Sequence, residues 1–344
     1  MTSLPKTYKC IVVKKAHGDF EVEERPMPSL NRGEVLVKTL ACGVCHSDCF
    51  VKDGLMPVPY PVVPGHEIVG DVAAVGEDEK KWQVGDRVGA GWEGGHCFRC
   101  QNCRRGDYVT CENGTVTGIF KDGGYAEYVV CNTESIAAVP RELDPAEAGP
   151  LLCAGITTFN SIRNVQHLRP GDTVAVQGIG GLGHLAIMFA RRMGYKVVAL
   201  SSSESKRDLA INKLGAHEYL SGDKQVDGLV KMGGANLIIC TANSAESISP
   251  LTKGLATGGT ILILAGGAGD VPFNTLDLLM KKACVQGWPS GSAIDSEDTL
   301  NFAAREGVKC HIERYDGRDL EQVKKAYSSM MDGSARFRSV LTFN

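Results

Sequence analysis

Four cysteines lie close together in one short stretch of the chain, at Cys97, Cys100, Cys103 and Cys111. The pattern C-x2-C-x2-C-x7-C gives four thiolates that one ion can bind together, which is typical of a closed tetrahedral zinc site. Three cysteines at this spacing also occur around iron–sulfur clusters, so such a cluster is the alternative. Because no proline follows the last cysteine and the loop carries charged residues, the sequence favours zinc.

A second set of metal-binding residue types is spread along the chain, at Cys45, His66 and Cys153. Two thiolates and one imidazole form a donor set that suits zinc, and they leave its fourth position open. Taken one at a time, each residue has a simpler explanation, since cysteine is common in protein cores and a lone histidine is usually just hydrogen-bonded. The spacing does not bring Cys153 to the other two, so this centre is a hypothesis.

A glycine-rich stretch between two apolar runs has the form of a phosphate-binding turn. Residues 173–176 alternate like a short buried strand, residues 184–193 are apolar at helical spacing, and residues 197–200 form a second strand. Between them lies Gly178-Ile179-Gly180-Gly181-Leu182-Gly183, which fits G-x-G-x-x-G. In such a unit the glycines make the turn, admit a pyrophosphate and let helix and strand pack closely. The stretch predicts dinucleotide binding at a helix N-terminus; the alternative is a glycine turn without a ligand.

The residues after the second strand indicate which nicotinamide cofactor is used. NAD sites usually place Asp or Glu there, because a carboxylate accepts from the ribose 2′-hydroxyl. Here the strand is followed by hydroxyls and cations, at Ser201, Ser202, Ser203, Lys206 and Arg207. These groups can bind a 2′-phosphate, so the sequence favours NADP. NAD is the alternative, because Glu204 could reach a ribose and the serines could simply begin a helix.

The elements that would position these residues fall into two groups. Residues 8–14, 20–24 and 34–40 read as strands that precede the first ligands. From about Gly155, strands at 173–177, 197–200, 237–241, 260–264 and 284–287 alternate with helices, which predicts a parallel sheet. Thr241 and Ala265 follow strand ends, where such a sheet binds its ligand. Further on, helices are expected at 298–305 and 320–331, and a last strand at 340–343.

Composition excludes several classes of function. The chain has 344 residues, a hydrophobic fraction of 43% and a formal net charge of −3, so two lobes are expected and no basic surface suggests nucleic acid. Its first residues lack a secretory pattern, and no apolar run is long enough to cross a bilayer, which favours a cytoplasmic protein without a membrane partner. The 13 cysteines are therefore expected to be metal ligands and buried thiols rather than disulfides.

Together these motifs resemble those of the zinc-containing alcohol dehydrogenases of the medium-chain dehydrogenase/reductase superfamily, over essentially the whole chain. Within the superfamily the chain is similar to the fungal and bacterial alcohol dehydrogenases and the cinnamyl alcohol dehydrogenases. The resemblance implies an α/β protein with a GroES-like, β-rich catalytic domain (residues 1–154 and 291–344) and a Rossmann NAD(P)-binding domain (residues 155–290). The motifs that carry it are Cys45-His46-Ser47-Asp48, Gly65-His66-Glu67, Val84-Gly85-Asp86-Arg87-Val88, the cysteine loop, Cys153-Ala154-Gly155 with Thr157-Thr158, and the glycine stretch.

The resemblance also implies roles for individual residues. Catalytic zinc would lie on Cys45, His66 and Cys153, with Glu67 able to approach it, and a structural zinc would lie in the cysteine loop. Asp48 would accept from the ring of His66 and fix its tautomer, and Ser47 would take the proton from the alcohol. The expected cofactor contacts are His46, Thr157, Gly178, Gly180, Gly181, Leu182, Gly183, Ser201, Ser202, Ser203, Lys206, Thr241, Ala265 and Arg338.

One position departs from the family pattern. Many relatives carry a histidine two residues after the aspartate as the outer proton carrier, and Phe50 stands there in this chain. The proton would therefore leave Ser47 through the ribose and water, or through another group. Phe50, Leu55 and Trp92 would line an apolar slot for the substrate; the alternative is that Leu55 and Trp92 are ordinary packing residues.

The predicted activity is reversible hydride transfer between the cofactor and an aliphatic or aromatic primary alcohol or aldehyde. Zinc would polarise the substrate oxygen, and the second zinc would only stabilise its loop. A nucleotide-binding protein without catalytic activity is the alternative from another class, but such a protein would be expected to lose a ligand or the relay hydroxyl. The family forms dimers and tetramers, and the sequence does not separate them.

Overall fold

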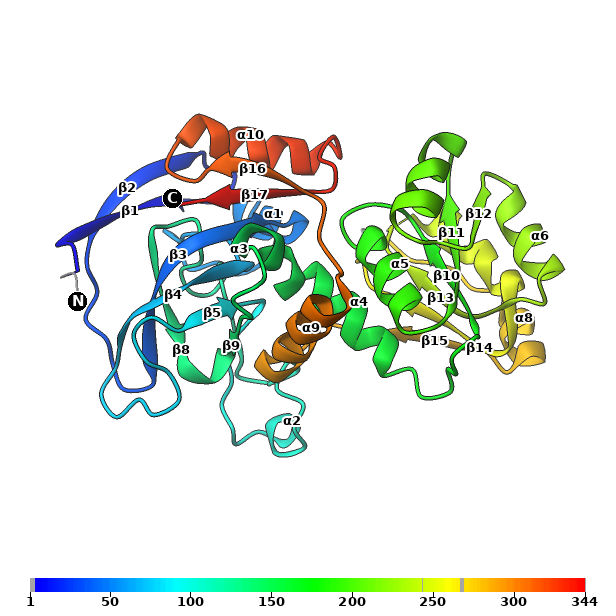
Figure 1. Cartoon of the computed structure of the whole chain (residues 1–344), viewed down its shortest axis with the longest axis horizontal. Helices are drawn as coiled ribbons and strands as arrows, with labels where there is room; N and C mark the ends of the chain where they lie inside the picture. Colours follow the sequence, from blue (N-terminus) through cyan, green and yellow to red (C-terminus); the bar gives the residue numbers. More distant parts are fainter. Residues whose placement is uncertain (1–3, 243, 267–268, 344) are drawn as a thin grey trace. The chain divides into compact units, whose positions relative to one another are not determined.

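The computed structural model describes residues 4–242, 244–266 and 269–343. The chain divides into two compact units (Figure 1). The first consists of Met1–Ile156 and Ser290–Asn344, and the second consists of Thr157–Pro289. Helix α4 (Ala154–Arg163) contains the residue at which the chain passes from the first unit to the second.

A largely antiparallel sheet forms the centre of the first unit. Its strands follow the order β16-β17-β3-β4-β5-β9, and β8 also pairs with β3. Because the last strand β17 pairs with β3, the C-terminal segment joins the sheet formed by the first part of the chain (Figure 1). The bounds are β3 (Glu34–Val44), β4 (Ile68–Val75), β5 (Arg87–Ala90), β8 (Tyr128–Asn132), β9 (Ile136–Ala138), β16 (Ile312–Asp316) and β17 (Arg338–Thr342).

Smaller elements surround this sheet. Strands β1 (Thr7–Val13) and β2 (Phe20–Pro26) form an antiparallel ladder, as do β6 (Glu93–Gly95) and β7 (Thr115–Val116). Consecutive residues Cys10–Val13 of β1, together with apolar residues of β3, enter a core of valines, isoleucines and aromatic rings. The helices of this unit are α1 (Cys49–Lys52), α2 (Gln101–Arg104), α3 (Pro145–Ala148), α9 (Ala293–Glu306) and α10 (Leu320–Met331), with 3-10 turns at His46–Asp48, Thr133–Ser135 and Gly149–Leu152.

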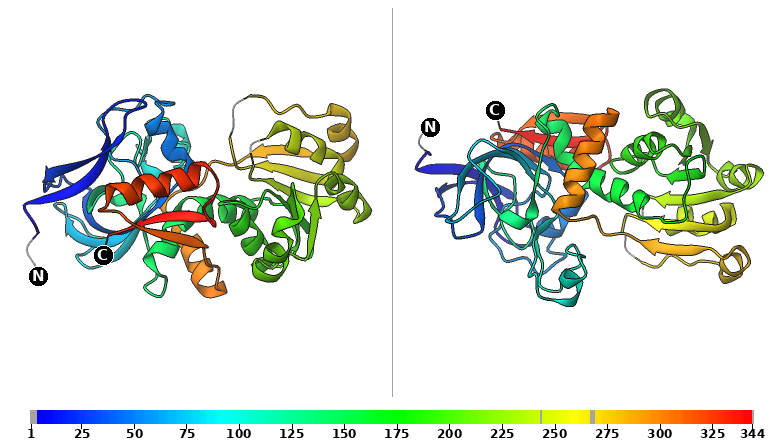
Figure 2. Two further views of the ribbon diagram at one scale, coloured as in Figure 1. Left: turned by 90° about the horizontal axis from the view of Figure 1, so that it is seen from above. Right: turned by 60° about the horizontal axis from the view of Figure 1, so that its bottom comes forward.

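The second unit is built on a parallel sheet in the order β12-β11-β10-β13-β14-β15; these strands are labelled in Figure 1, and Figure 2 gives two further views of them. Its strands are apolar and mostly buried, as expected when helices cover a parallel sheet. The strands are β10 (Thr173–Gln177), β11 (Lys196–Ser201), β12 (Glu218–Ser221), β13 (Ala235–Cys240), β14 (Leu255–Ile263) and β15 (Cys284–Gly287). The helices are α5 (Gly183–Arg192), α6 (Lys224–Lys231), α7 (Ala245–Ile248) and α8 (Thr275–Lys281), with short helical turns at Glu204–Lys206, Leu209–Lys213 and Ser249–Gly254.

Several predicted elements begin earlier than expected, among them β14, which starts at Leu255 instead of residue 260, and β13, which starts at Ala235 instead of residue 237. Helix α9 starts at Ala293 instead of residue 298, because Ser292 and Asp295 form a capping box in which the Ser292 amide donates to the Asp295 carboxylate (2.8 Å). Strand β17 starts at Arg338 instead of residue 340. Arg338 is therefore part of the sheet, and its side chain is buried.

Candidate active site and metal centres

Cys45, His66, Glu67 and Cys153 come together, with one ligand atom of each within 4.8 Å of the others. Cys45 directly follows β3, and His66 and Glu67 directly precede β4. These two strands pair antiparallel, with Cys42 opposite Ile68, so the end of one lies beside the start of the other. Cys153 arrives on the 3-10 turn Gly149–Leu152, which packs against β3 and β4.

The spacing within this cluster suits a tetrahedral zinc ion. The Sγ atoms of Cys45 and Cys153 lie 3.8 Å apart. With Zn–S bonds of about 2.3 Å, two sulfur ligands of a tetrahedral site lie about 3.8 Å apart. His66 Nε2 and Glu67 Oε2 are buried without a hydrogen-bond partner among the described residues. A cation bound between the sulfurs and the imidazole would satisfy the otherwise unpartnered nitrogen.

Electrostatics within the cluster also favour a divalent cation. A hydrogen bond from Cys153 lowers the pKa of Cys45 well below its usual range, against the effect of burial. Burial opposes a charge on His66, yet the neighbouring Cys45 and Asp48 raise the pKa of its ring well above the usual value. The same contact with Cys45 raises the pKa of Cys153 well above its usual value, so the two thiols do not ionise together on their own. A bound metal cation would supply the counter-charge that lets both become thiolates.

Asp48 lies beside the imidazole of His66, from which the resemblance implies that it accepts a hydrogen bond. Its Oδ1 atom is 3.3 Å from His66 Nδ1, although their alignment falls short of a hydrogen bond. The other oxygen, Oδ2, accepts from the Cys45 backbone amide (2.9 Å) and from the Tyr125 hydroxyl (2.9 Å). Tyr125 carries no sequence signal of a site and was not expected here.

Glu67 forms a buried ion pair with Arg338. Burial raises the pKa of Glu67 to about 7, and the Arg338 guanidinium opposes this rise. The structure thus gives Arg338 a partner that the sequence did not indicate. Its predicted contact with the cofactor pyrophosphate stays a prediction.

The remaining residues of the first unit that were predicted near the substrate or the cofactor differ in their exposure and contacts. Ser47 is partly exposed and His46 is exposed, both on the 3-10 turn that follows Cys45. The ring of Trp92 meets the ring of His66 edge-on (centroids 5.1 Å apart) and that of Phe50 in the same way (6.5 Å). Leu55 is 64% exposed, so the packing alternative does not describe it.

The four cysteines of the loop also come within ligand distance of one another. Cys111 Sγ lies 3.6 Å from Cys97 Sγ and 3.8 Å from Cys100 Sγ, again close to the edge of a sulfur tetrahedron. Backbone amides of Arg99 and Cys100 lower the pKa of Cys97 to about 6, which keeps its thiolate available near neutral pH. The loop therefore fits the closed site predicted from its spacing.

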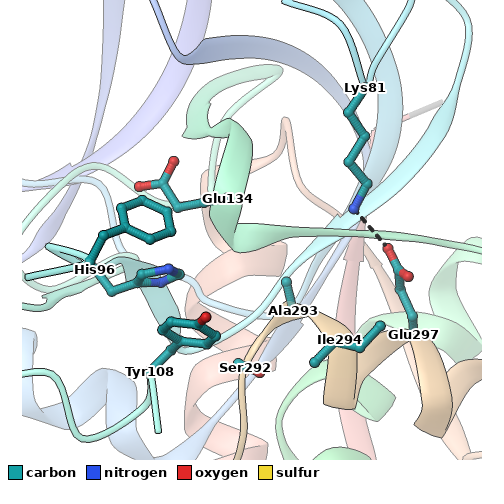
Figure 3. A pocket seen from close by; sticks show the side chains of 9 residues that line it. Lys81, His96, Tyr108, Glu134, Ser292, Ala293, Ile294 and Glu297 are labelled. Carbon is teal, nitrogen blue, oxygen red and sulfur yellow. Dashed lines mark hydrogen bonds and ion pairs between the residues drawn. The ribbon is translucent and has the colours of Figure 1, made fainter. Parts of the chain in front are cut away.

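A small hollow of about 200 Å³ lies beside this loop (Figure 3). The rings of His96 and Tyr108 stack at 4.2 Å, and His96 Nδ1 pairs with Glu93 at 3.0 Å. The Glu93–His96 pair was not predicted, because nothing in the spacing separates it from ordinary loop residues. On the opposite wall Lys81 pairs with Glu297 of α9 (3.3 Å), as the dashed line in Figure 3 shows.

The glycine turn has the geometry that its predicted role requires. Gly178 has a positive φ of 89°, and a Cβ atom on Gly183 would come within 1.9 Å of the Gly178 carbonyl oxygen. A Cβ atom on Gly180 would meet nothing within 4 Å, so the second glycine leaves open space above the backbone. Helix α5 begins at Gly183, and its free amide groups suit a pyrophosphate.

The other predicted cofactor residues of the second unit surround the ends of its strands. The Thr241 hydroxyl donates to the Gln177 carbonyl oxygen (2.9 Å) at the first glycine, and Ala265 follows β14. Ser201 is the last residue of β11, and Ser202 and Ser203 are exposed beyond it. Thr157 is a buried residue of α4, and Gly181 and Leu182 complete the glycine turn.

Charged groups near Ser201 are already paired within the unit. Lys206 Nζ donates to the carbonyl oxygen of Ile179 in the glycine turn (2.8 Å). Glu204 accepts from Arg207 and from Ser221, and these hydrogen bonds lower its pKa to about 2. Its carboxylate is thus occupied by protein donors, which weakens the alternative in which Glu204 accepts from a ribose.

Comparison with known proteins identifies the family. Residues 31–141 match the alcohol dehydrogenase GroES-like domain, and residues 181–305 match the zinc-binding dehydrogenase domain. The alcohol dehydrogenase patD of Penicillium expansum is 45% identical over 343 residues, 99% of each chain. The chain belongs to the zinc-containing alcohol dehydrogenases of the medium-chain superfamily, which makes it an oxidoreductase and confirms the predicted GroES-like and Rossmann architecture.

Two solved structures of this fold differ in the cofactor they hold. The CAD of Helicobacter pylori, complexed with NADP(H), matches with a TM-score of 0.86 and 25% identity, covering 98% of both chains. The acetophenone reductase of Geotrichum candidum, in complex with NAD, matches with a TM-score of 0.84 and 26% identity, covering 99% of this chain and 98% of the other. The family therefore does not decide the cofactor. Among the described residues, no helix is long and apolar enough to cross a membrane.

Proposed function

We propose that this protein is a zinc-dependent alcohol dehydrogenase that transfers a hydride between NADP(H) and a primary alcohol or aldehyde of aliphatic or aromatic type. The observation that carries the proposal is the set of Cys45, His66 and Cys153, in which the buried His66 Nε2 has no hydrogen-bond partner among the described residues. Zinc bound there would polarise the substrate oxygen as a Lewis acid, and the nicotinamide would exchange the hydride.

In this proposal the surrounding residues hold the reactants and move the proton. Ser47 accepts the alcohol proton, and Phe50 cannot carry it further because it has no titratable group. The rings of Phe50 and Trp92, with Leu55, present an apolar wall to the carbon skeleton. Asp48 orients His66, and Glu67 is held by Arg338 beside the thiols.

The choice of NADP rests on the residues after β11. Hydroxyl groups are available there on Ser201, Ser202 and Ser203. The Lys206 ammonium group lies at the glycine turn, where it donates a hydrogen bond to the Ile179 carbonyl oxygen. The carboxylate that an NAD site would use is absent from position 201, and Glu204 is taken by Arg207 and Ser221. These contacts support NADP, and NAD with the same zinc chemistry is the alternative.

Initial rates with NADPH and NADH against a panel of aliphatic and aromatic aldehydes test this proposal. Higher kcat/KM with NADPH is expected, and Ser201→Asp should reverse the preference by about tenfold or more, because a carboxylate repels the 2′-phosphate. Faster turnover with NADH in the unaltered protein would contradict the NADP assignment. Activity with neither cofactor, with one zinc per chain, would support the noncatalytic alternative.

Further proposals concern the metal content, the location, the partners and the assembly of the protein. We expect two zinc ions per chain, a cytoplasmic protein, small-molecule partners without nucleic acid or membrane, and a homodimer or homotetramer. Metal analysis of the purified protein tests the zinc count. Sedimentation velocity measures the assembly.

A further inference from the structure

Tyr125 is a fully buried residue whose hydroxyl reaches the active-site cluster from outside it. The hydroxyl donates to Asp48 Oδ2 at 2.9 Å, across 77 residues of sequence. Burial raises the pKa of Tyr125 well above its usual value, so the phenol keeps the proton that it donates.

The two carboxylate oxygens of Asp48 contact different partners. Oδ2 accepts from the Tyr125 hydroxyl and from the Cys45 amide, each at 2.9 Å. Oδ1 is left for His66 Nδ1, which lies 3.3 Å away. With Oδ2 held by two donors, the carboxylate cannot rotate about its Cβ–Cγ bond without losing both hydrogen bonds.

Tyr125 is itself fixed by its backbone and by its ring. Its amide donates to the Pro64 carbonyl oxygen (3.0 Å), and its carbonyl oxygen accepts from the Ile11 amide (2.8 Å). A Cβ atom on Gly65 would come within 2.5 Å of the Tyr125 ring, so the ring lies directly on the residue that precedes His66. The side chain therefore joins Asp48 to the segment that carries His66.

We propose that Tyr125 is a positioning residue for the Cys45–His66–Cys153 metal centre, acting through Asp48 on the ring of His66. With Asp48 fixed, the imidazole presents Nδ1 to the carboxylate and Nε2 to the two thiols. This inference rests on the proposed function, since it concerns the metal that this centre would bind. Residues that orient a metal-binding histidine commonly change metal affinity by about 10–100-fold when they are removed.

The test is the variant Tyr125→Phe, which removes one hydroxyl and keeps the ring on Gly65. Cobalt(II) and zinc affinities of the Cys45 centre are measured by competition with a chromophoric chelator, with His66→Ala marking the contribution of the cysteine loop alone. We expect about tenfold weaker binding at the Cys45 centre and an altered cobalt d–d spectrum, with the loop site unchanged.

Tyr315→Phe is the matched control. Tyr315 is also buried in the first unit, on β16, which is separated from β3 by one strand, and its hydroxyl contacts Glu313 (3.1 Å) and Ser329 (3.2 Å) instead of Asp48. This variant should bind both metals as the unaltered protein does. Equal losses in Tyr125→Phe and Tyr315→Phe would reveal a general effect of a missing buried hydroxyl and would overturn the proposal.

A double-mutant cycle with Asp48→Asn gives a second readout if Tyr125→Phe is poorly folded. When Tyr125 acts through Asp48, adding Tyr125→Phe to Asp48→Asn should cause little further loss of affinity. Additive losses, or an unchanged affinity and spectrum in Tyr125→Phe alone, would refute the role. If the unaltered protein binds metal only at the loop, the proposed function itself fails, and this outcome is distinct from a failure of the Tyr125 inference.

Discussion

The two cysteine clusters of the first unit use the same ligand atom in different settings. In the loop, four cysteines within 97–111 bring four sulfurs together, and three of the four side chains are partly exposed. In the other centre, Cys45 and Cys153 are 108 positions apart, and they meet His66 and Glu67, which are fully buried. One cluster is a local property of its loop, whereas the other exists only when the sheet has formed.

The difference also separates the chemistry that each cluster can support. Four sulfurs fill a tetrahedral coordination sphere, so a metal in the loop has no position for a substrate. Two sulfurs and one imidazole leave a position open, and Glu67, Asp48 and Ser47 supply polar groups around it. We therefore expect loss of the loop to reduce stability and loss of the assembled centre to abolish activity.

The largest effect is expected from His66→Ala. Removing this ligand should reduce turnover by about 10³-fold or more, since the metal supplies several kcal/mol of transition-state stabilisation. Metal analysis should show zinc falling from two ions per chain to one. Retention of both zinc ions with full activity would show that His66 is not a ligand.

The matched change in the loop is Cys103→Ser, which removes its most buried thiol. We expect the loop zinc to be lost and Tm to fall by on the order of 10 °C, because metal binding at such a site contributes to folding. Activity measured per folded molecule at low temperature should stay close to that of the unaltered protein. A large loss of kcat without a fall in Tm would show that the loop supports catalysis and not stability, contrary to this comparison.

Ser47→Ala tests the hydroxyl that adjoins the assembled centre. Loss of the first proton acceptor should lower kcat by about 100-fold and leave both zinc ions in place. Thr110→Ala removes an exposed hydroxyl beside Cys111 and is expected to change neither quantity. Similar kcat values for the two variants would mean that the proton leaves by a route that avoids Ser47.

The smallest effect concerns the hollow beside the loop (Figure 3). His96→Gln breaks a side-chain contact with Glu93 that is nearly inaccessible to solvent, so Tm should fall by about 2–4 °C, corresponding to roughly 1 kcal/mol. Phe98→Ala is the comparison, because Phe98 is 59% exposed and should change Tm by less. Thermal unfolding followed by circular dichroism measures both. An equal fall in Tm in the two variants would show that the Glu93–His96 contact contributes no more to stability than an exposed side chain of the same loop.

Several parts of this molecule could be predicted because their signals are local. The cysteine loop, the glycine turn and α10 each depend on residues that are close in sequence, and the structure has α10 at the predicted Leu320–Met331. The early start of α9 was missed, although Ser292 and Asp295 are a local capping signal. Arg338 was missed as a partner of Glu67 because the two residues are 271 positions apart.

The sequence by itself determined which residue types were available and which short segments would form a turn, a helix or a closed set of thiols. Only the tertiary structure decided that Cys153 would join Cys45 and His66, that Arg338 would enter the sheet beside Glu67, and that the hydroxyl of Tyr125 would reach Asp48. The physical reason is that local geometry follows from backbone and side-chain preferences within a few residues. Contacts between distant segments depend on which strands pair and which faces they bury.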